Sequence, residues 1–223
     1  LQQAIQIMLD PADCGPACIS LSQDVQGEVY DYPEEFFKER VHTIRRPKPD
    51  DFQIKEAAEL IKKSKKPIII AGGGVFYSDA TEELSAFAKK HNIPVTQTVM
   101  GYSSIKKDHS HYLGTIGGLG GKAANNLSKE TDTAIAIGTK LADFTTGSWA
   151  NFENPNFKLV SINAARFDAN KHMAQAVVGD AKVSLMELSQ ALGSWKADDS
   201  WYKKSREELK KWEAYVDKES GPT

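Results

Sequence analysis

The sequence has little cysteine, no long apolar run and no excess of charge of either sign, and each lack excludes a class of protein. Cys14 and Cys18 are the two cysteines in 223 residues, too few for a disulfide framework or a structural zinc site. We therefore expect reduced thiols in a cytoplasmic protein. Apolar stretches fall well short of the roughly 20 residues that span a membrane. The net charge of -2 argues against nucleic-acid and membrane-surface partners, which select basic patches.

The first 50 residues lack the material for a core of their own. The chain opens on Leu1 rather than Met, inside the apparent helix LQQAIQIMLD, and one expected strand follows at 17–22. A lone helix and strand do not make an independent core. The prolines of RRPKPDD at 45–51 indicate a linker. We expect the chain to be a piece of a longer polypeptide.

Short apolar strands alternate with amphipathic helices from residue 51 onward. The predicted strands are PIIIA from residue 67, IPVTQTV from 93, TAIAIG from 133, KLVSIN from 158 and QAVVG from 175, with a possible sixth near Tyr112 and Leu113. Apolar strands that alternate with helices predict a parallel sheet covered on both faces. The predicted fold class is α/β, a Rossmann-like (DHS-like) three-layer fold with a parallel sheet of about six strands and helices on both faces.

Aspartates and one asparagine mark the predicted helix ends. An Asp at 50 or 51, Asp79 and Asp180 each precede an amphipathic run, and Asp is a favoured residue for capping the first turn of a helix. Asn92 is a predicted stop, because Asn tolerates the left-handed conformation that ends many helices.

The tail from Trp195 onward is charged and helical in pattern. Two interpretations are open for it. Trp201, Arg206 and Trp212 could dock the tail on another element, or the tail could be a solvated connecting helix.

Glycines gather where the predicted strands end. Gly72–Gly74 follow the first strand, Gly101 the second and Gly138 a later one, while more glycines at 114–121 precede the helix KAANNL. Ligands of open parallel sheets bind at the carboxyl ends of the strands, where glycine allows backbone N–H groups to approach a phosphate. Four hydroxyl side chains could add donors: Thr139, Thr145, Thr146 and Ser148. The pattern suits a nucleotide pocket, but tight turns alone would also explain it.

The dinucleotide fingerprint is incomplete. In GGGVFY, Tyr77 stands where the third glycine belongs, and GLGGKA at 118–123 follows no clear strand. Asn163 stands at a strand end where the ribose of a dinucleotide usually meets an acid. His109 and His111 beside Asp108 could bind a metal or could be loop histidines at the surface. No Ser-His-Asp or Cys-His spacing appears, so no catalytic residue and no metal ligand is predicted in this segment.

Several stretches resemble the thiamine-diphosphate-dependent enzymes related to acetolactate synthase. GPACISLSQDVQGEVYDYP resembles the exit of their pyrimidine-binding domain, and KKPIIIAGGGVFYSDATEELSAFAKKHNIPVTQT resembles the opening of their Rossmann-like central domain. LGTIGGLGGKAANNLSKETDTAIAIGTKLADFTTGSW resembles the glycine-rich centre of that domain. The resemblance implies a pyrimidine-domain remnant at 1–35, a linker at 36–50, the central domain at 51–195 and a helical linker toward the pyrophosphate-binding domain at 196–223.

The stretches DFTTGSWANFENPN and SINAARFDANKH narrow the resemblance. They are similar to the branch of the family that opens a C–C bond of a trihydroxycyclohexane-1,2-dione in myo-inositol catabolism and gives a deoxyglucuronate. The resemblance implies a parent hydrolase that uses thiamine diphosphate and Mg2+. It places the cofactor-activating Glu before Leu1 and the G-D-G…N motif after Thr223, so we expect this segment alone to bind neither cofactor and to be inactive.

In relatives the central domain carries FAD, ADP or nothing. By that analogy the candidate nucleotide contacts are Gly73, Gly74, Gly117, Gly118, Thr139 and Asn163. Asn163 in place of an acid, and Tyr102 where relatives often have Lys, favour an empty or vestigial pocket. The expected partners are the flanking pyrimidine- and pyrophosphate-binding domains of the same chain, in a homo-oligomeric parent.

Other interpretations of the sequence, from different classes of protein, stay open. The chain could be a nucleotide-binding regulatory module for ADP or FAD, or part of an acetolactate-synthase-like enzyme with another substrate. A sirtuin-like deacylase would need paired C-x-x-C motifs, which two cysteines spaced C-x-x-x-C do not supply.

Overall fold

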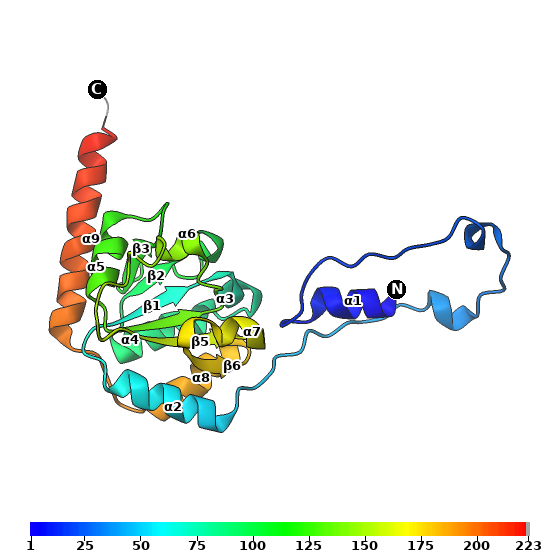
Figure 1. Cartoon of the computed structure of the whole chain (residues 1–223), viewed down its shortest axis with the longest axis horizontal. Helices are drawn as coiled ribbons and strands as arrows, with labels where there is room; N and C mark the ends of the chain where they lie inside the picture. The colour runs from blue at the N-terminus through cyan, green and yellow to red at the C-terminus, as the bar shows by residue number, and fades with distance from the viewer. Residues whose placement is uncertain (222–223) are drawn as a thin grey trace. The chain divides into compact units, whose positions relative to one another are not determined.

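The computed structural model describes residues 1–221, which fall into two compact units. The first unit is Leu1–Arg46, and the second begins at Pro47. The colours of Figure 1 follow the chain from the first unit, in blue, through the second. No helix in the described part of the chain has both the length and the apolar character needed to cross a membrane.

The first unit holds one helix and much extended chain. Helix α1 covers Gln2–Leu9 as expected, and 3-10 turns follow at η1 (Val25–Gly27) and η2 (Glu34–Phe37). The predicted strand at 17–22 is wrong, because this segment forms no strand and pairs with none among the described residues. A strand needs a neighbour to satisfy its N–H and C=O groups, and the residues of this unit supply none there.

The second unit is built on one parallel sheet, as predicted. Its strands are β1 (Pro67–Ala71), β2 (Val95–Gln97), β3 (Tyr112–Thr115), β4 (Thr133–Ile137), β5 (Lys158–Asn163) and β6 (Gln175–Val178). Their order is β3-β2-β1-β4-β5-β6, and every neighbouring pair is parallel. The sixth strand suspected near Tyr112 is β3, at one edge of the sheet.

Helices cover both faces of this sheet (Figure 1). On one face lie α2 (Asp51–Lys62), α4 (Thr81–His91) and α8 (Ala181–Leu192), which bury their apolar residues against Ile69, Ile135 and Val160. On the other face lie α5 (Lys122–Glu130) and α9 (Asp199–Glu219), packed over Ile68, Ile70 and Ala136. Because successive residues of a strand point to opposite faces, both sets must be apolar. This confirms the three-layer α/β fold.

Short helices follow several strands at their carboxyl ends. They are α3 (Gly73–Tyr77) after β1, η3 (Val99–Gly101) after β2, α6 (Asp143–Thr146) after β4, and α7 (Arg166–Ala169) with η4 (Lys171–Met173) after β5. The carboxyl edge of the sheet is therefore lined by tight, helical turns rather than by long open loops.

Three of the predicted helix-end signals are confirmed. The side chain of Asp50 accepts the N–H of Phe52 at 2.8 Å at the start of α2. Asp180 accepts two N–H groups in the first turn of α8. Asn92 ends α4 with a φ of 56°. Each signal depends only on residues within one turn of the helix end, which explains why the sequence reveals it.

The prediction for Asp79 is wrong. Helix α4 begins at Thr81 with Ala80 before it, and Asp79 itself has a φ of 54°. The N–H of Asp79 donates to the carbonyl of Phe76, so Asp79 closes the short helix α3 instead of opening α4. A residue that ends one helix in the left-handed conformation is not also in the extended conformation typical of an N-cap.

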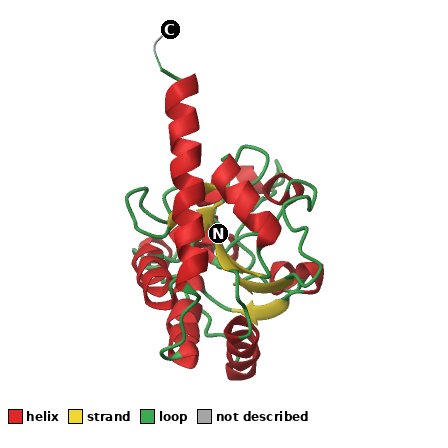
Figure 2. Ribbon diagram, turned by 90° about the vertical axis from the view of Figure 1, so that its left-hand side faces the viewer, coloured by secondary structure: helices red, strands yellow, loops and turns green. Residues whose placement is uncertain are grey.

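The tail docks on the sheet along α9, which confirms the first of its two interpretations. Trp201 is 3 % exposed, and its Nε1–H donates to the carbonyl of Pro67 at 2.8 Å. Arg206 donates to the carbonyl of Tyr112 at 2.9 Å, which satisfies an acceptor on the outer edge of β3. Figure 2 looks onto α9, which runs alongside α5 and past the end of the domain. Helix α9 thus covers an edge strand that would otherwise offer unpaired backbone groups.

Candidate functional site

The candidate site lies at the carboxyl edge of the sheet, where the strand order changes direction. From β1 the chain builds outward through β2 to β3, then returns to the other side of β1 to form β4. Such a switch point is where open parallel sheets hold ligands, because the two loops diverge there and leave a crevice. Here the two loops are Gly72–Gly74 and Gly138–Thr139, both singled out from the sequence.

These two glycine loops touch each other. The N–H of Gly74 donates to the carbonyl of Gly138 at 2.9 Å. A Cβ on Gly74 would lie 2.6 Å from the Cα of Gly138, and a Cβ on Gly72 would lie 2.3 Å from the carbonyl oxygen of Gly138. Glycine is required at these positions because backbone packs on backbone. At least one of the backbone N–H groups that were expected to bind a phosphate, that of Gly74, therefore already donates to a carbonyl of the protein.

Asn125 fixes Gly117, in the second glycine cluster, through two hydrogen bonds. It was not among the residues predicted from the sequence. The N–H of Gly117 donates to Oδ1 of Asn125 at 2.9 Å, and Nδ2 of Asn125 donates back to the carbonyl of Gly117 at 3.0 Å. The N–H of Gly118 donates to the carbonyl of Phe144 at 2.9 Å. Asparagine is unfavourable in the interior of a helix. Its position inside α5 could therefore have indicated that its side chain makes a specific hydrogen bond.

Thr139 and Asn163 lie together between the ends of β4 and β5. The hydroxyl of Thr139 accepts the N–H of Leu141 at 3.2 Å. Oδ1 of Asn163 accepts the N–H of Ala165 at 3.0 Å, and its Nδ2 lies 3.4 Å from the carbonyl oxygen of Thr139. Both side chains stabilise the turns that leave their strands, so the structure brings the candidate residues to one edge and ties them to their own loops.

The hydroxyl-rich stretch after β4 is largely self-bonded. Thr146 is fully buried, and its hydroxyl donates to the carbonyl of Asp143 at 3.2 Å. Ser148 donates to the carboxylate of Asp143 at 3.2 Å, and the N–H of Trp149 donates to the Thr146 hydroxyl at 3.3 Å. Trp149 is half-buried and packs against the apolar cluster on the α5 side of the sheet. Two of the four candidate donors therefore shape a compact turn.

An ion-pair cluster joins the loops after β4 and β5, and it was not predicted from the sequence. Asp168 is 9 % exposed, with Nζ of Lys171 at 2.6 Å and Nζ of Lys140 at 3.9 Å. A nearly buried carboxylate needs such partners, since an unpaired buried charge is strongly unfavourable. The i,i+3 spacing of Asp168 and Lys171 could have indicated this ion pair. Both residues lie in the stretch SINAARFDANKH, which was interpreted only as a family motif.

His111 is buried, unlike the surface histidine considered above. It is 6 % exposed, its Nε2 lies 3.1 Å from Oδ1 of Asn92, and its ring lies against Tyr202 at 4.6 Å between centroids. Burial lowers the pKa of His111 to about 4, so the ring is neutral at pH 7. Among residues 1–221 no group of three His, Cys, Asp or Glu is arranged to hold a metal. His111 thus links the end of α4 to α9.

This burial predicts loss of stability in acid. In the unfolded chain His111 takes up a proton near pH 6.5, whereas in the folded chain it does so only near pH 4. Its contribution to the free energy of unfolding is therefore complete above pH 6.5 and is lost as the pH falls toward 4. His109, Arg206 and Lys89 face the ring and act in the same direction by repulsion. At 1.36 kcal/mol per pKa unit, His111 contributes on the order of 2 kcal/mol between pH 6.5 and 4.5.

Urea unfolding of the wild-type chain and of His111→Gln at several pH values would measure this. The variant is expected to show a shallower fall in unfolding free energy from pH 6.5 to 4.5. His42→Gln is the matched control, because His42 is exposed, and it should keep the wild-type slope. An unchanged slope in His111→Gln would contradict the assignment.

Comparisons with known proteins identify a family and several relatives of this chain. The family described as "Thiamine pyrophosphate enzyme, central domain" matches residues 54–188, which include the whole sheet. A 3D-(3,5/4)-trihydroxycyclohexane-1,2-dione hydrolase of Clostridium perfringens is 48% identical over 189 residues, which are 85% of this chain and 30% of the relative. Relatives with the same name from Clostridium botulinum strain Eklund 17B and Bacillus licheniformis are 44% and 45% identical, over 93% and 89% of this chain.

The chain therefore spans only about a third of these relatives, 33% of the one from C. botulinum and 31% of the one from B. licheniformis. The family match, residues 54–188, covers all six strands of the sheet. The fold, the position of the glycine loops at the switch point and the family match agree with one another. The chain belongs to the thiamine pyrophosphate enzyme central-domain family.

Proposed function

We propose that this chain is the central, architectural domain of a thiamine-diphosphate-dependent hydrolase. The substrate of the parent enzyme is 3D-(3,5/4)-trihydroxycyclohexane-1,2-dione, whose ring C–C bond is opened to 5-deoxyglucuronate in cytoplasmic myo-inositol catabolism. The observation that carries the proposal is the 48% identity over 85% of this chain to a relative with that hydrolase name. The parent is a homo-oligomer, and this segment supplies none of its catalytic residues.

The domain division follows the same proposal. Residues 1–35 are the end of a pyrimidine-binding domain, 36–50 a linker, 51–195 the central domain and 196–223 a helical linker toward a pyrophosphate-binding domain. The docking of Trp201 on Pro67 supports a linker whose first turns are fixed to the central domain. Gly73, Gly74, Gly117, Gly118, Thr139 and Asn163 form a vestigial nucleotide pocket in this view.

Hydrogen bonding at the candidate pocket supports the architectural role. The N–H groups of Gly74, Gly117 and Gly118 donate to acceptors of the protein itself. A phosphate would have to break these bonds, and a buried donor or acceptor left without a partner costs about 1–3 kcal/mol. The loops are arranged to hold each other, which favours a role in positioning neighbouring domains over one in binding FAD or ADP.

Among residues 1–221, no side-chain cluster suits the divalent metal that accompanies thiamine diphosphate. A divalent cation such as Mg2+ is bound through oxygen ligands and phosphate, and the described residues contain no acidic or histidine cluster arranged for one. The proposal therefore assigns the cofactor and the Mg2+ to the flanking domains. When bound there, thiamine diphosphate supplies the carbanion chemistry, and this domain contributes one wall of the substrate entrance.

The proposal is tested with the complete polypeptide that carries this chain and with the 223-residue chain alone. With thiamine diphosphate and Mg2+ present, we expect the complete polypeptide to open the dione and the 223-residue chain to show no turnover. The assay follows loss of the dione and appearance of the deoxyglucuronate by chromatography. Pyruvate is the control substrate, because an acetolactate-synthase-like enzyme would condense it.

Two results would contradict the proposal. One is ring opening by the 223-residue chain alone, and the other is a folded complete polypeptide that consumes pyruvate but not the dione. Titration calorimetry of the 223-residue chain with ADP, FAD and NAD separates the regulatory alternative, since micromolar affinity for any of them would support a working nucleotide pocket.

A further inference from the structure

Seven large apolar side chains lie more than half exposed on the short elements that follow the strands: Met173 on η4, which is 99% exposed, and six more. Phe76 and Tyr77 are 62% and 77% exposed on α3, and Met100 is 76% exposed on η3. Tyr102, directly after η3, is 72% exposed, while Phe144 on α6 and Phe167 on α7 are 57% and 77% exposed. We call these six the carboxyl-edge patch: Phe76, Tyr77, Met100, Tyr102, Phe144 and Phe167.

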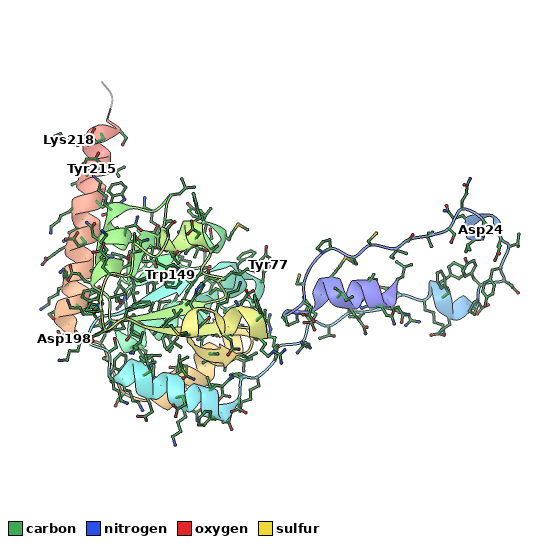
Figure 3. The ribbon with its side chains drawn as sticks, in the orientation of Figure 1. Asp24, Tyr77, Trp149, Asp198, Tyr215 and Lys218 are labelled. Atoms are coloured by element: carbon green, nitrogen blue, oxygen red, sulfur yellow. The ribbon has the colours of Figure 1, made fainter. Side chains whose placement is uncertain are left out.

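The patch gathers on one edge because the sheet is parallel. Its residues follow β1, β2, β4 and β5, whose carboxyl ends all point the same way. Within it, a Cβ on Gly73 would lie 3.0 Å from the carbonyl oxygen of Met100 and 3.5 Å from the ring of Tyr77, so α3 and η3 adjoin. The rings of Phe76 and Tyr77 are 6.1 Å apart. Figure 3 shows Tyr77 at the margin of the domain.

The size of this surface sets it apart from scattered exposed residues. An aromatic side chain offers roughly 150–250 Å², so the six together expose on the order of 700 Å². The largest apolar patch on a typical monomer covers roughly 300–600 Å², whereas one side of a standard protein interface covers about 800 Å². The patch has the dimensions of an interface.

Elsewhere the second unit covers most of its apolar surface with its own helices. Both faces of the sheet are buried, and α9 shields the outer edge of β3 through Arg206. Of the other exposed large apolar residues in this unit, Phe52 and Met186 lie singly on α2 and α8. Val99 lies on η3, Leu119 in the loop before α5, and Tyr215 and Val216 near the end of α9. Single exposed apolar residues are normal, whereas the elements at the carboxyl edge carry more exposed large apolar side chains than any other part of this unit.

We propose that the carboxyl-edge patch is buried by another domain of the same polypeptide. The inference rests on the proposed function, in which this chain is one domain of a longer protein. The relative from C. perfringens has 70% of its length outside the match, since the match covers 30% of it. A domain on the same chain is present at an effective concentration of about millimolar when the linker is short, and it therefore competes well against a second molecule for this surface.

Methionine oxidation tests the proposal, because the chain offers a matched pair. Met100 belongs to the patch and is 76% exposed, while Met186 on α8 is 59% exposed and lies outside it. Hydrogen peroxide converts exposed Met to the sulfoxide, which mass spectrometry quantifies for each peptide. In the 223-residue chain both residues should react readily. In the complete polypeptide we expect Met100 to react about tenfold more slowly, with a much smaller change at Met186.

Equal reactivity of Met100 in the two proteins would overturn the proposal, as would an equal slowing of Met100 and Met186. Photo-crosslinking identifies the occupant. With the substitution Tyr77→p-benzoylphenylalanine in the complete polypeptide, a crosslink to a segment outside residues 1–223 at monomer mass on a denaturing gel supports the proposal. A crosslinked dimer would assign the patch to a second copy and contradict it.

This readout is separate from activity. A complete polypeptide that opens the dione but leaves Met100 reactive would refute the buried patch and keep the proposed function. Protection of Met100 in a polypeptide with no activity toward the dione would support the buried patch and refute the proposed function.

Discussion

Replacing Trp201 with alanine is expected to lower the free energy of unfolding of the second unit by about 3–5 kcal/mol, the range for truncating a buried aromatic residue to alanine. Trp201 is 3 % exposed and packs in the core between the sheet and α9. Its Nε1–H donates to the carbonyl of Pro67 at 2.8 Å, so the change leaves both a cavity and a buried acceptor without this partner. The Nζ of Lys66 also lies 5.6 Å from the ring centroid.

Guanidinium unfolding followed by tryptophan fluorescence measures this effect. The other tryptophans, Trp149, Trp195 and Trp212, all lie in the second unit, so the signal reports that unit. Trp201→Phe is the informative control, because it keeps most of the apolar volume and removes the N–H donor, and it should lose only about 1–3 kcal/mol. A loss below about 1 kcal/mol in Trp201→Ala would mean that α9 is not docked on the sheet.

The substitution Gly138→Ala is expected to destabilise the second unit by about 2–5 kcal/mol. Two costs combine at this residue. Its φ of 60° is unfavourable for any residue with a Cβ, which costs about 1–2 kcal/mol. The new Cβ would also lie 2.5 Å from the Cα of Gly74, and forcing apart two packed loops costs about 1–3 kcal/mol.

Gly147→Ala separates the two costs. Gly147 has a φ of 57°, close to that of Gly138, but a Cβ there would meet nothing nearer than Nδ2 of Asn151 at 3.5 Å, an ordinary contact. It should lose only about 1–2 kcal/mol, the backbone cost alone. If chemical denaturation gave equal losses for the two variants, the loops after β1 and β4 would not be in contact.

Much of the fold could be predicted because its signals are local or periodic. Strands such as Pro67–Ala71 are apolar at every position, since both of their faces are buried. The caps at Asp50 and Asp180 involve only the next turn of chain. Asp79 misled because a short helix precedes it, and five residues such as Gly73–Tyr77 carry too little pattern to be recognised.

The candidate site was predicted in place but not in detail. The parallel sheet brings Gly72–Gly74 and Gly138 to one edge, and topology alone requires that. Whether their N–H groups face a ligand or each other depends on how closely two loops distant in sequence approach. His111 raised the same difficulty, since its burial comes partly from Tyr202 on α9, which lies 91 positions away in the sequence. The expected strand at 17–22 failed because no described residue of its unit pairs with it, and an apolar pattern does not reveal whether a partner strand is present.

The bond between Trp201 and Pro67 joins residues 134 positions apart, and this has a consequence for how the protein is made. One face of the sheet stays partly uncovered until α9 has been synthesised, because α5 is the only one of its two long helices that precedes the last strand. Contacts so distant in sequence form late, because they close the longest loops. During translation the unfinished face is a surface that chaperones can recognise, and emergence of the last helix ends that exposure.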